Sequence, residues 1–175
     1  MRYKLLIICF FSTFLFFSQN QKRLALVIAN EEYEHYSKLK NPISDAELIS
    51  EKLDSLGFQV IKGYNLATNT EMLDLIKDFG RQRDSMQVGV IYYAGHAVQL
   101  NNKNYLLPTQ ANIDFGLYGQ DDTEGKLMEL DEKAVNVQKI TYWLGRKANE
   151  KGQINILFLD ACRNNPISDG TRNVG

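Results

Sequence analysis

Apolar and polar positions along the chain follow two alternating patterns. Short, nearly continuous apolar runs, bounded by charged or turn-forming residues, are typical of strands that are buried on both faces of a sheet. Such runs occupy residues 23–30, 58–64, 88–95 and 154–160. Three other segments, 44–56, 70–84 and 136–149, carry apolar residues at the three- or four-residue spacing of a helix. Because strands and helices follow one another in turn, the pattern predicts an α/β fold with a parallel sheet and helices on both faces.

The segments between these elements carry further signals. Ser44 or Asp45 is expected to cap the first helix, and Gly57 to end it. The short runs "AVQL" and "NYLLP" flank "NNK", which predicts a small hairpin directly after the third strand. The stretch 112–131 contains several Gly and Asp residues and has no steady period, so we expect it to form a surface loop.

Three polar features stand at the carboxyl ends of the predicted strands. They are Asn30, the pair Gly95 and His96, and the run from Asp160 to Cys162. In a parallel sheet these ends lie along one edge, where the crossover connections leave a crevice for ligands. The fold could therefore bring His96 and Cys162 side by side.

The composition narrows the classes of function. The chain has 175 residues, of which 44% are hydrophobic and 23% charged, and this predicts one globular domain. A net charge of −1 with interspersed signs offers no basic surface to nucleic acid. With two cysteines and two histidines, the chain has no zinc-binding spacing. We therefore expect no nucleic-acid partner, no metal and no cofactor.

The first twenty residues differ from the rest of the chain. Arg2 and Lys4 precede an apolar stretch over residues 5–17, and the polar "SQNQKR" follows. This order is typical of a secretory signal peptide, and the stretch is shorter than the roughly 20 residues of a membrane-spanning helix. We expect a signal peptide at 1–20 and an exported domain at 21–175. The alternative is that the segment is retained as a membrane anchor.

Removal of that segment, which contains Cys9, would leave Cys162 as the one cysteine, so no internal disulfide could form. The thiol is then either a passive packing residue or a reactive group. An imidazole such as that of His96 could take the thiol proton and later protonate a departing amine. The amides of Gly95 and Cys162 could hold an oxyanion. The residue types and their spacing leave the passive and the reactive interpretation open.

Four segments carry a resemblance to a known family. They are "RLALVIANEEY", "LKNPISDAELISEKLDSLGFQV", "VGVIYYAGHAVQLNNKNYLLP" and "INILFLDACRNNP". In this order they resemble the large-subunit portion of the caspase-like cysteine peptidases, most closely the bacterial members and the metacaspase and paracaspase branches. The resemblance covers residues 23–175. It implies a three-layer αβα sandwich with a mainly parallel sheet, acting on a peptide or protein substrate.

The resemblance also implies roles for individual residues. It makes His96 the catalytic histidine, Cys162 the nucleophile that forms a thioester, and the amides of Gly95 and Cys162 the oxyanion donors. The caspase signature has glutamine where this chain has Asp160. Metacaspases and paracaspases cleave after Arg or Lys and use acids there, and Asp160 and Asp45 match their pocket acids. Asp45 keeps the helix cap as an alternative role.

The sequence departs from the family in two respects. Family members often have glycine at the positions of Ala29 and Ala97, where alanine is a small change. They also have a small-subunit portion of two further strands after the nucleophile loop, and this sequence stops at Gly175. We therefore expect activity to need a partner chain that supplies those strands, a longer gene product that contains them, or a homodimer.

Other interpretations remain open. The chain could be a catalytically silent caspase-like module that binds peptides or proteins, or a non-catalytic domain of the receiver or flavodoxin kind.

Some metacaspases depend on calcium, and Asp121, Asp122 and Glu124 would be candidate ligands, but an acidic loop is usually only solvated. His35 lies in the polar run "EEYEHYS" and is expected at the surface.

Overall fold

The computed structural model describes residues 22–145 and 152–162, and these form a mixed sheet with helices on both faces. The predicted segment 1–20 lies outside the described residues. The strands are β1 (Arg23–Ala29), β2 (Phe58–Tyr64), β3 (Val88–Leu100), β4 (Lys103–Leu106), β5 (Val135–Asn136) and β6 (Ile154–Cys162). The helices are α1 (Pro42–Ser55), α2 (Asn69–Arg83), α3 (Thr123–Lys133) and α4 (Val137–Gly145), with a short 3-10 helix, η1 (Phe115–Leu117).

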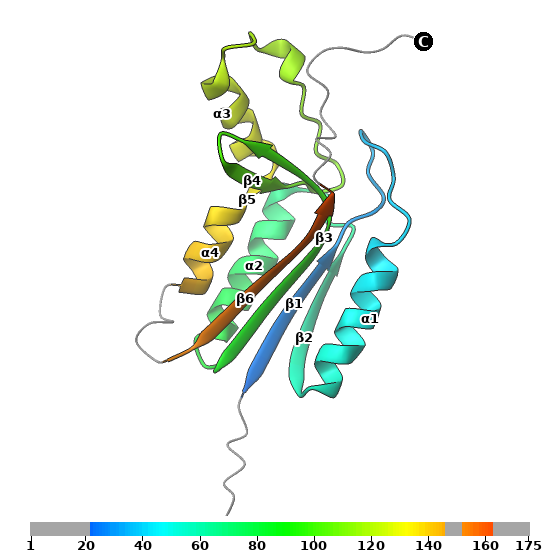
Figure 1. Cartoon of the computed structure of the whole chain (residues 1–175), viewed down its shortest axis with the longest axis vertical. Coiled ribbons are helices and arrows are strands. Elements are labelled where there is room, and N and C mark those ends of the chain that lie inside the picture. The colour runs from blue at the N-terminus through cyan, green and yellow to red at the C-terminus, as the bar shows by residue number, and fades with distance from the viewer. Residues whose placement is uncertain (1–21, 146–151, 163–175) are drawn as a thin grey trace, which may run out of the picture.

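The sheet has a parallel part and an antiparallel extension (Figure 1). Strands β2, β1, β3 and β6 lie next to one another in that order and are parallel. The long β3 continues beyond this part and pairs antiparallel with β4, which pairs antiparallel with β5. Among the described strands, β6 pairs with β3 alone, so it forms an edge of the parallel part.

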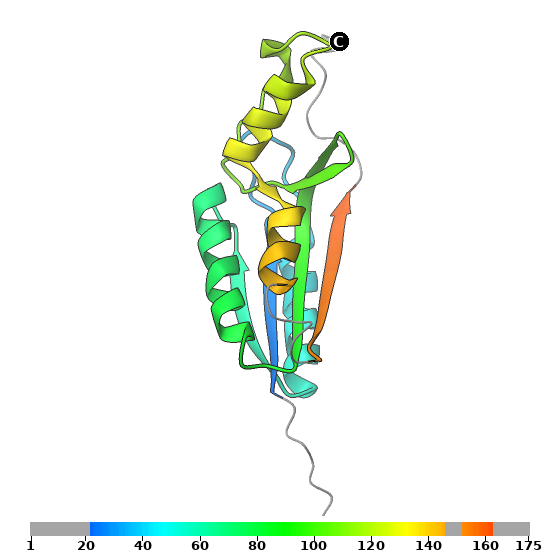
Figure 2. The same cartoon turned by 90° about the vertical axis from the view of Figure 1, so that its left-hand side faces the viewer.

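The buried strand β1 separates two hydrophobic layers. Leu24, Leu26 and Ile28 pack in one cluster with residues of α2 and α4. Val27 and Ala29 point the other way and pack in a second cluster with α1. Successive side chains of a strand point to opposite faces, so a run without polar residues is buried on both. Figure 2 shows α2 and α4 on the same side of the sheet, and the predicted three-layer αβα architecture is confirmed.

The start of α1 differs from the prediction. The helix begins at Pro42, and the N-cap position is Asn41, whose side chain makes no capping bond. Proline is favoured in the first helical turn because its φ is already helical and its missing N–H has no partner there. The Ser44 hydroxyl donates to the Asn41 carbonyl over 2.9 Å. The prediction that Ser44 or Asp45 caps the helix is therefore wrong, and the Asp45 side chain has no capping role.

The third strand is longer than predicted and contains the first half of the hairpin. It does not end at Gly95 but runs to Leu100, and the turn to β4 is made by Asn101 and Asn102. These asparagines have φ values of 49° and 58°. Two consecutive residues in the left-handed region form the tight turn that matches the twist of a hairpin. The predicted hairpin is thus confirmed, and it extends the sheet beyond the position of His96.

The stretch 112–131 is not simply a loop. It contains η1 and most of α3, and the Asp122 side chain caps α3 by accepting a hydrogen bond from the Gly125 amide over 2.9 Å. Phe115 and Leu130 are buried in a third cluster, beneath the hairpin. The prediction of a loop was wrong because the apolar residues are few and are ordered by this tertiary contact rather than by a long helical period.

Candidate active site

The structure places the backbone of His96 directly beside that of Cys162. The parallel pairing of β3 with β6 matches Ala94 with Asp160, Gly95 with Ala161, and His96 with Cys162. Neighbouring strands lie about 4.8 Å apart. The side chain of Cys162 lies outside the described part of the chain. The predicted approach of the two positions is confirmed for the backbone, because both stand at the same level of adjacent strands.

The His96 imidazole is buried and oriented by a backbone carbonyl. The residue is 5% exposed, and Nε2 lies 2.8 Å from the carbonyl oxygen of Ser37. A carbonyl oxygen can only accept, so Nε2 must carry a proton and donate it. In the neutral ring the proton is then absent from Nδ1, which is buried and has no hydrogen-bond partner among the described residues. Nδ1 is therefore the nitrogen that can act as a base.

Two buried tyrosines hold the backbone of His96. The His96 amide donates to the Tyr33 hydroxyl over 2.8 Å, and the Tyr93 hydroxyl donates to the His96 carbonyl over 2.7 Å. The two hydroxyls are 3.3 Å apart, and the Tyr33 ring lies 4.4 Å from the imidazole, centroid to centroid. The amide and the carbonyl of His96 thus both form hydrogen bonds to side chains from other positions. These bonds fix the position of the His96 backbone, to which the imidazole is attached.

Burial of the Tyr33 hydroxyl makes the stability of the domain depend on pH in the alkaline range. Burial raises the pKa of Tyr33 to about 12, from about 10 in an unfolded chain. The folded state therefore holds the proton more tightly, so the contribution is full below pH ~10 and is lost as the pH rises through ~12. We expect the free energy of unfolding to fall over that range by up to about 3 kcal/mol from this residue. Urea unfolding at several pH values should show a smaller fall in Tyr33→Phe; an equal fall would contradict the assignment.

Gly95 has a steric reason for lacking a side chain. Its φ is +155°, and a Cβ atom there would lie 2.6 Å from the Tyr33 hydroxyl oxygen and 2.7 Å from that of Tyr93. Real Cβ atoms do not approach other atoms so closely. The glycine thus lets the two hydroxyls reach the His96 backbone. Its role as an oxyanion donor stays a prediction.

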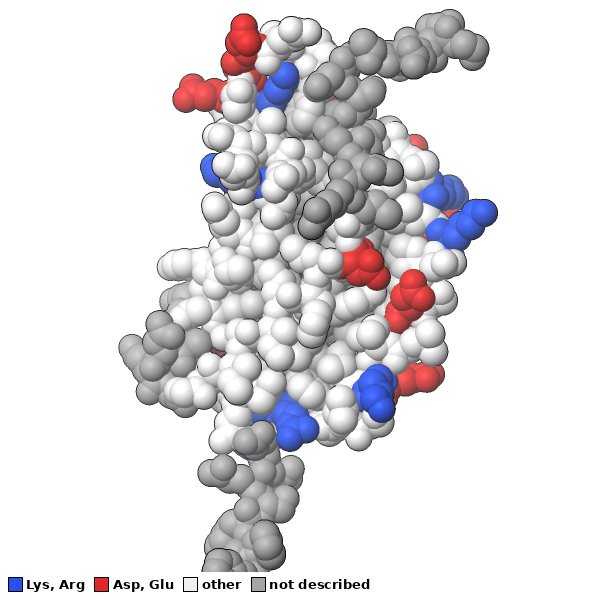
Figure 3. Space-filling view, in the orientation of Figure 1, with Lys and Arg blue, Asp and Glu red and all other residues white. Residues whose placement is uncertain are grey.

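The two predicted pocket acids lie on the α1 side of the sheet. Asp160 is exposed on β6, and its Oδ2 accepts a hydrogen bond from the Tyr92 hydroxyl over 3.0 Å. Asp45 is exposed in the first turn of α1. Burial, together with the charges of Asp160 and Asp45, raises the pKa of Tyr92. The charges of both carboxylates thus act on the same hydroxyl, and Asp160 also contacts it. Figure 3 shows acidic side chains near the middle of this face, over α1 and the neighbouring sheet, whereas the basic side chains lie nearer the rim, where there are further acidic ones.

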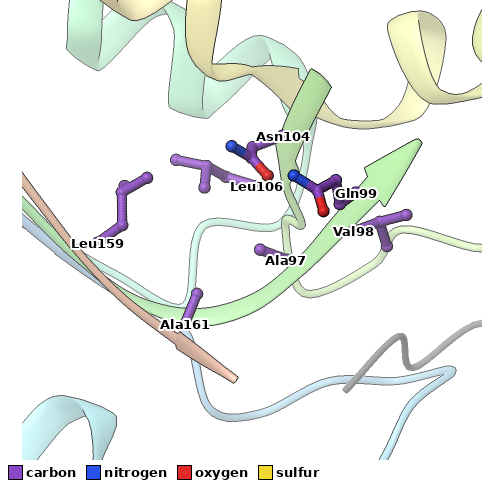
Figure 4. Close-up of a pocket in the computed structure, with 7 residues that line it drawn as sticks. All are labelled: Ala97, Val98, Gln99, Asn104, Leu106, Leu159 and Ala161. Atoms are coloured by element: carbon purple, nitrogen blue, oxygen red, sulfur yellow. The ribbon is translucent and has the colours of Figure 1, made fainter. Parts of the chain in front are cut away.

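Both faces of β6 are open beside the site. On one face a hollow of about 460 Å³ lies against β4, and Figure 4 shows Leu159 and Ala161 of β6 on one side of it and Asn104 and Leu106 across. On the α1 face, an apolar groove of about 370 Å³ is lined by residues that include Ile49, Tyr92, Phe158 and Asp160. Four apolar side chains of β6 are well exposed: Ile154 (57%), Phe158 (54%), Leu159 (40%) and Ile156 (37%).

Comparison with known proteins identifies the family. The family model of the caspase domain matches residues 22–174 of the sequence. The chain belongs to the caspase domain family. Members of this family are cysteine peptidases, which agrees with the resemblance seen in the sequence. The third interpretation, a receiver- or flavodoxin-like domain, is thereby wrong.

Two curated relatives of this caspase-domain chain show how the similarity is distributed. The human mucosa-associated lymphoid tissue lymphoma translocation protein 1 is 28% identical over 149 residues, which cover 85% of the chain and 16% of the human protein. Caspase-1-B of Xenopus laevis is 35% identical over 66 residues, 38% of the chain and 17% of the frog protein. The chain thus spans about one sixth of the length of the relatives it matches.

Several residues of the caspase-domain site were not predicted. The loop "EEYEHYS" supplies Tyr33, Tyr36 and the Ser37 carbonyl, all of which contact or adjoin His96. The sequence feature that could have predicted them is the spacing of Tyr33, Tyr36 and Leu39, which is every third residue in a polar segment.

His35 is exposed, as expected. Asn30 is fully buried, and its side chain bonds the backbone of Leu66 and Leu107, so it joins two loops rather than facing the site.

Metal-binding and membrane-spanning features are absent from residues 22–145 and 152–162. No group of three or more His, Cys, Asp or Glu side chains there is placed to hold a metal ion. Of the candidate calcium ligands, Asp122 is engaged as the N-cap of α3. No helix in these ranges is long and apolar enough to cross a membrane.

Proposed function

We propose that the chain is the large-subunit portion of a cysteine endopeptidase that cleaves after Arg or Lys through Cys162 and His96. The observation that carries the proposal is the pairing of His96 with Cys162 on adjacent strands, with the imidazole oriented so that Nδ1 has no hydrogen-bond partner among the described residues. A thiol next to a base in a restrained geometry is the minimal requirement for covalent acyl transfer.

The proposed reaction uses His96 twice. Nδ1 takes the proton of the Cys162 thiol, and the thiolate attacks the carbonyl carbon of the scissile bond. The amides of Gly95 and Cys162 would stabilise the oxyanion. The imidazolium then protonates the departing amine, leaving a thioester that a water molecule hydrolyses with Nδ1 as the base. The Ser37 carbonyl accepts from Nε2 throughout, so it stabilises the imidazolium that forms in each half of the reaction.

The proposed preference for basic side chains rests on Asp160 and Asp45. A guanidinium or ammonium group would make charge-assisted hydrogen bonds to the carboxylates, whereas an acidic side chain would be repelled. Both acids are exposed and unpaired with any lysine or arginine among the salt bridges of the described residues. Their charges therefore remain free for a substrate.

We further propose that additional polypeptide covers β6, as a small-subunit partner or as a second copy of the chain. The exposed apolar side chains and the open edge of β6 support this. An edge strand of this kind is normally protected in a stable protein. Such a polypeptide would complete the walls of a substrate groove at the hollows on the two sides of the strand.

Fluorogenic peptides ending in Arg, Lys, Asp or norleucine test the specificity. They are incubated with the chain alone and with a co-expressed polypeptide that supplies strands for β6. We expect Arg and Lys peptides to be cleaved, and Asp160→Asn to lower kcat/KM for them by about 10- to 100-fold relative to norleucine. The matched control is Asp54→Asn, which changes an exposed acid at the other end of α1.

Each other result has a definite meaning. A preference for Asp peptides would contradict the assignment of Asp160 and Asp45 as pocket acids. No turnover of any peptide in either condition would contradict the peptidase and favour a silent module that binds peptides.

A further inference from the structure

The Tyr92 hydroxyl reaches Asp160 because of the register between β3 and β6. Tyr92 is paired with Phe158, and Asp160 is paired with Ala94, one step further along the same face. Ala94 carries only a methyl group, so the space beside Asp160 is open to the longer tyrosine. The Tyr92 hydroxyl donates to Oδ2 of Asp160 over 3.0 Å. The bond is thus built into two neighbouring strands rather than into a mobile loop.

The tyrosine itself is held firmly. It is 7% exposed and packs in the cluster that joins the sheet to α1, with Ala46 and Ala94. Burial raises the pKa of the Tyr92 hydroxyl, and the negative charges of Asp160 and Asp45 raise it further. The group therefore stays protonated, and remains a donor, over the whole physiological pH range.

A neutral donor has a particular effect on an exposed carboxylate. A lysine or arginine in this place would neutralise Asp160, whereas tyrosine restrains it and leaves its charge intact. The bond engages Oδ2, and no bond to Oδ1 is found within the described residues. Restraining a side chain before a ligand arrives lowers the entropy cost of binding.

We propose that Tyr92 is a positioning residue for substrate specificity, which holds Asp160 in the orientation that accepts the cationic end of an Arg or Lys side chain. This rests on the proposed function, which makes Asp160 the reader of basic side chains. Tyr92 acts through Asp160 and does not itself contact the substrate.

The test measures binding, so that it does not depend on turnover. The chain with Cys162→Ala, in complex with the polypeptide that supplies strands for β6, is titrated calorimetrically with a short peptide amide ending in arginine and with the same peptide ending in norleucine. We expect Tyr92→Phe to weaken binding of the arginine peptide by about 5- to 10-fold and to leave the norleucine peptide unchanged. Tyr64→Phe is the matched control, because its ring packs against the same cluster on β2; it should change neither affinity.

A double-mutant cycle separates positioning from a structural role. If Tyr92 acts through Asp160, then Tyr92→Phe has no further effect once Asp160→Asn is present. An equal loss in that background, an equal loss for both peptides, or no preference for arginine in the parent would each overturn the proposal. The catalytic function is judged separately by alkylation of Cys162 with iodoacetamide in the chain that retains the thiol, where rapid alkylation that slows in His96→Ala supports an activated thiol whatever the peptide affinities are.

Discussion

Replacing Cys162 with alanine is expected to lower kcat/KM for an Arg-ended peptide by at least about 10³-fold. The thiolate is the proposed nucleophile, and alanine offers no atom that can form the acyl bond. His96→Ala should cause a loss of similar size, because the thiol then has no base and the amine no proton donor. Residues that act as one unit do not add, so the double variant should be no slower than either single variant.

The control for this experiment is His35, the other histidine of the chain. His35 is exposed and lies in the same segment as Tyr33 and Tyr36, so His35→Ala tests whether loss of any imidazole near the site matters. It should retain the parent rate. Iodoacetamide provides a second measurement, because alkylation of Cys162 should slow in His96→Ala and not in His35→Ala. Unchanged turnover in Cys162→Ala would remove the basis for the peptidase.

The parallel sheet and the meeting of His96 with Cys162 could be predicted from the sequence for a simple reason. Runs such as Arg23–Ala29 are apolar at nearly every position, which fits a strand covered on both faces. Strand ends in a parallel sheet share one edge, so polar residues at the ends of two runs are candidates for contact. Both inferences depend on local pattern and on topology, and neither requires knowledge of side-chain packing.

The surroundings of His96 could not be predicted in the same way. Its hydrogen bonds to Ser37 and Tyr33 join residues about sixty positions apart, and the intervening chain gives no periodic signal for them. The start of α1 differed from the prediction because several residues that can cap a helix occur together, and Pro42 rather than a side-chain bond decides the first turn. Tertiary contacts of this kind are specified by the complete fold, and local propensity is only a weak guide to them.

Gly95→Ala is expected to lower the free energy of unfolding by about 2–4 kcal/mol, measured by urea unfolding. The added Cβ would stand 2.6 Å and 2.7 Å from the hydroxyls of Tyr33 and Tyr93, and the backbone φ of +155° is rarely adopted by residues with side chains. Relief of the clash must displace the hydroxyls that bond the His96 amide and carbonyl. Turnover should therefore fall even at temperatures where the variant remains folded.

Two other glycines separate the clash from backbone strain. Gly57 has a φ of +78° with nothing within 4 Å of the position that a Cβ would take, and Gly119 has the same open space without a positive φ. Gly57→Ala should cost about 1 kcal/mol from strain alone, and Gly119→Ala close to nothing. If Gly95→Ala lowers the free energy of unfolding no more than Gly57→Ala does, the side chains of Tyr33 and Tyr93 move away from the added Cβ at little cost. In that case the two hydroxyls would not hold His96, and its orientation would depend on the Ser37 carbonyl alone.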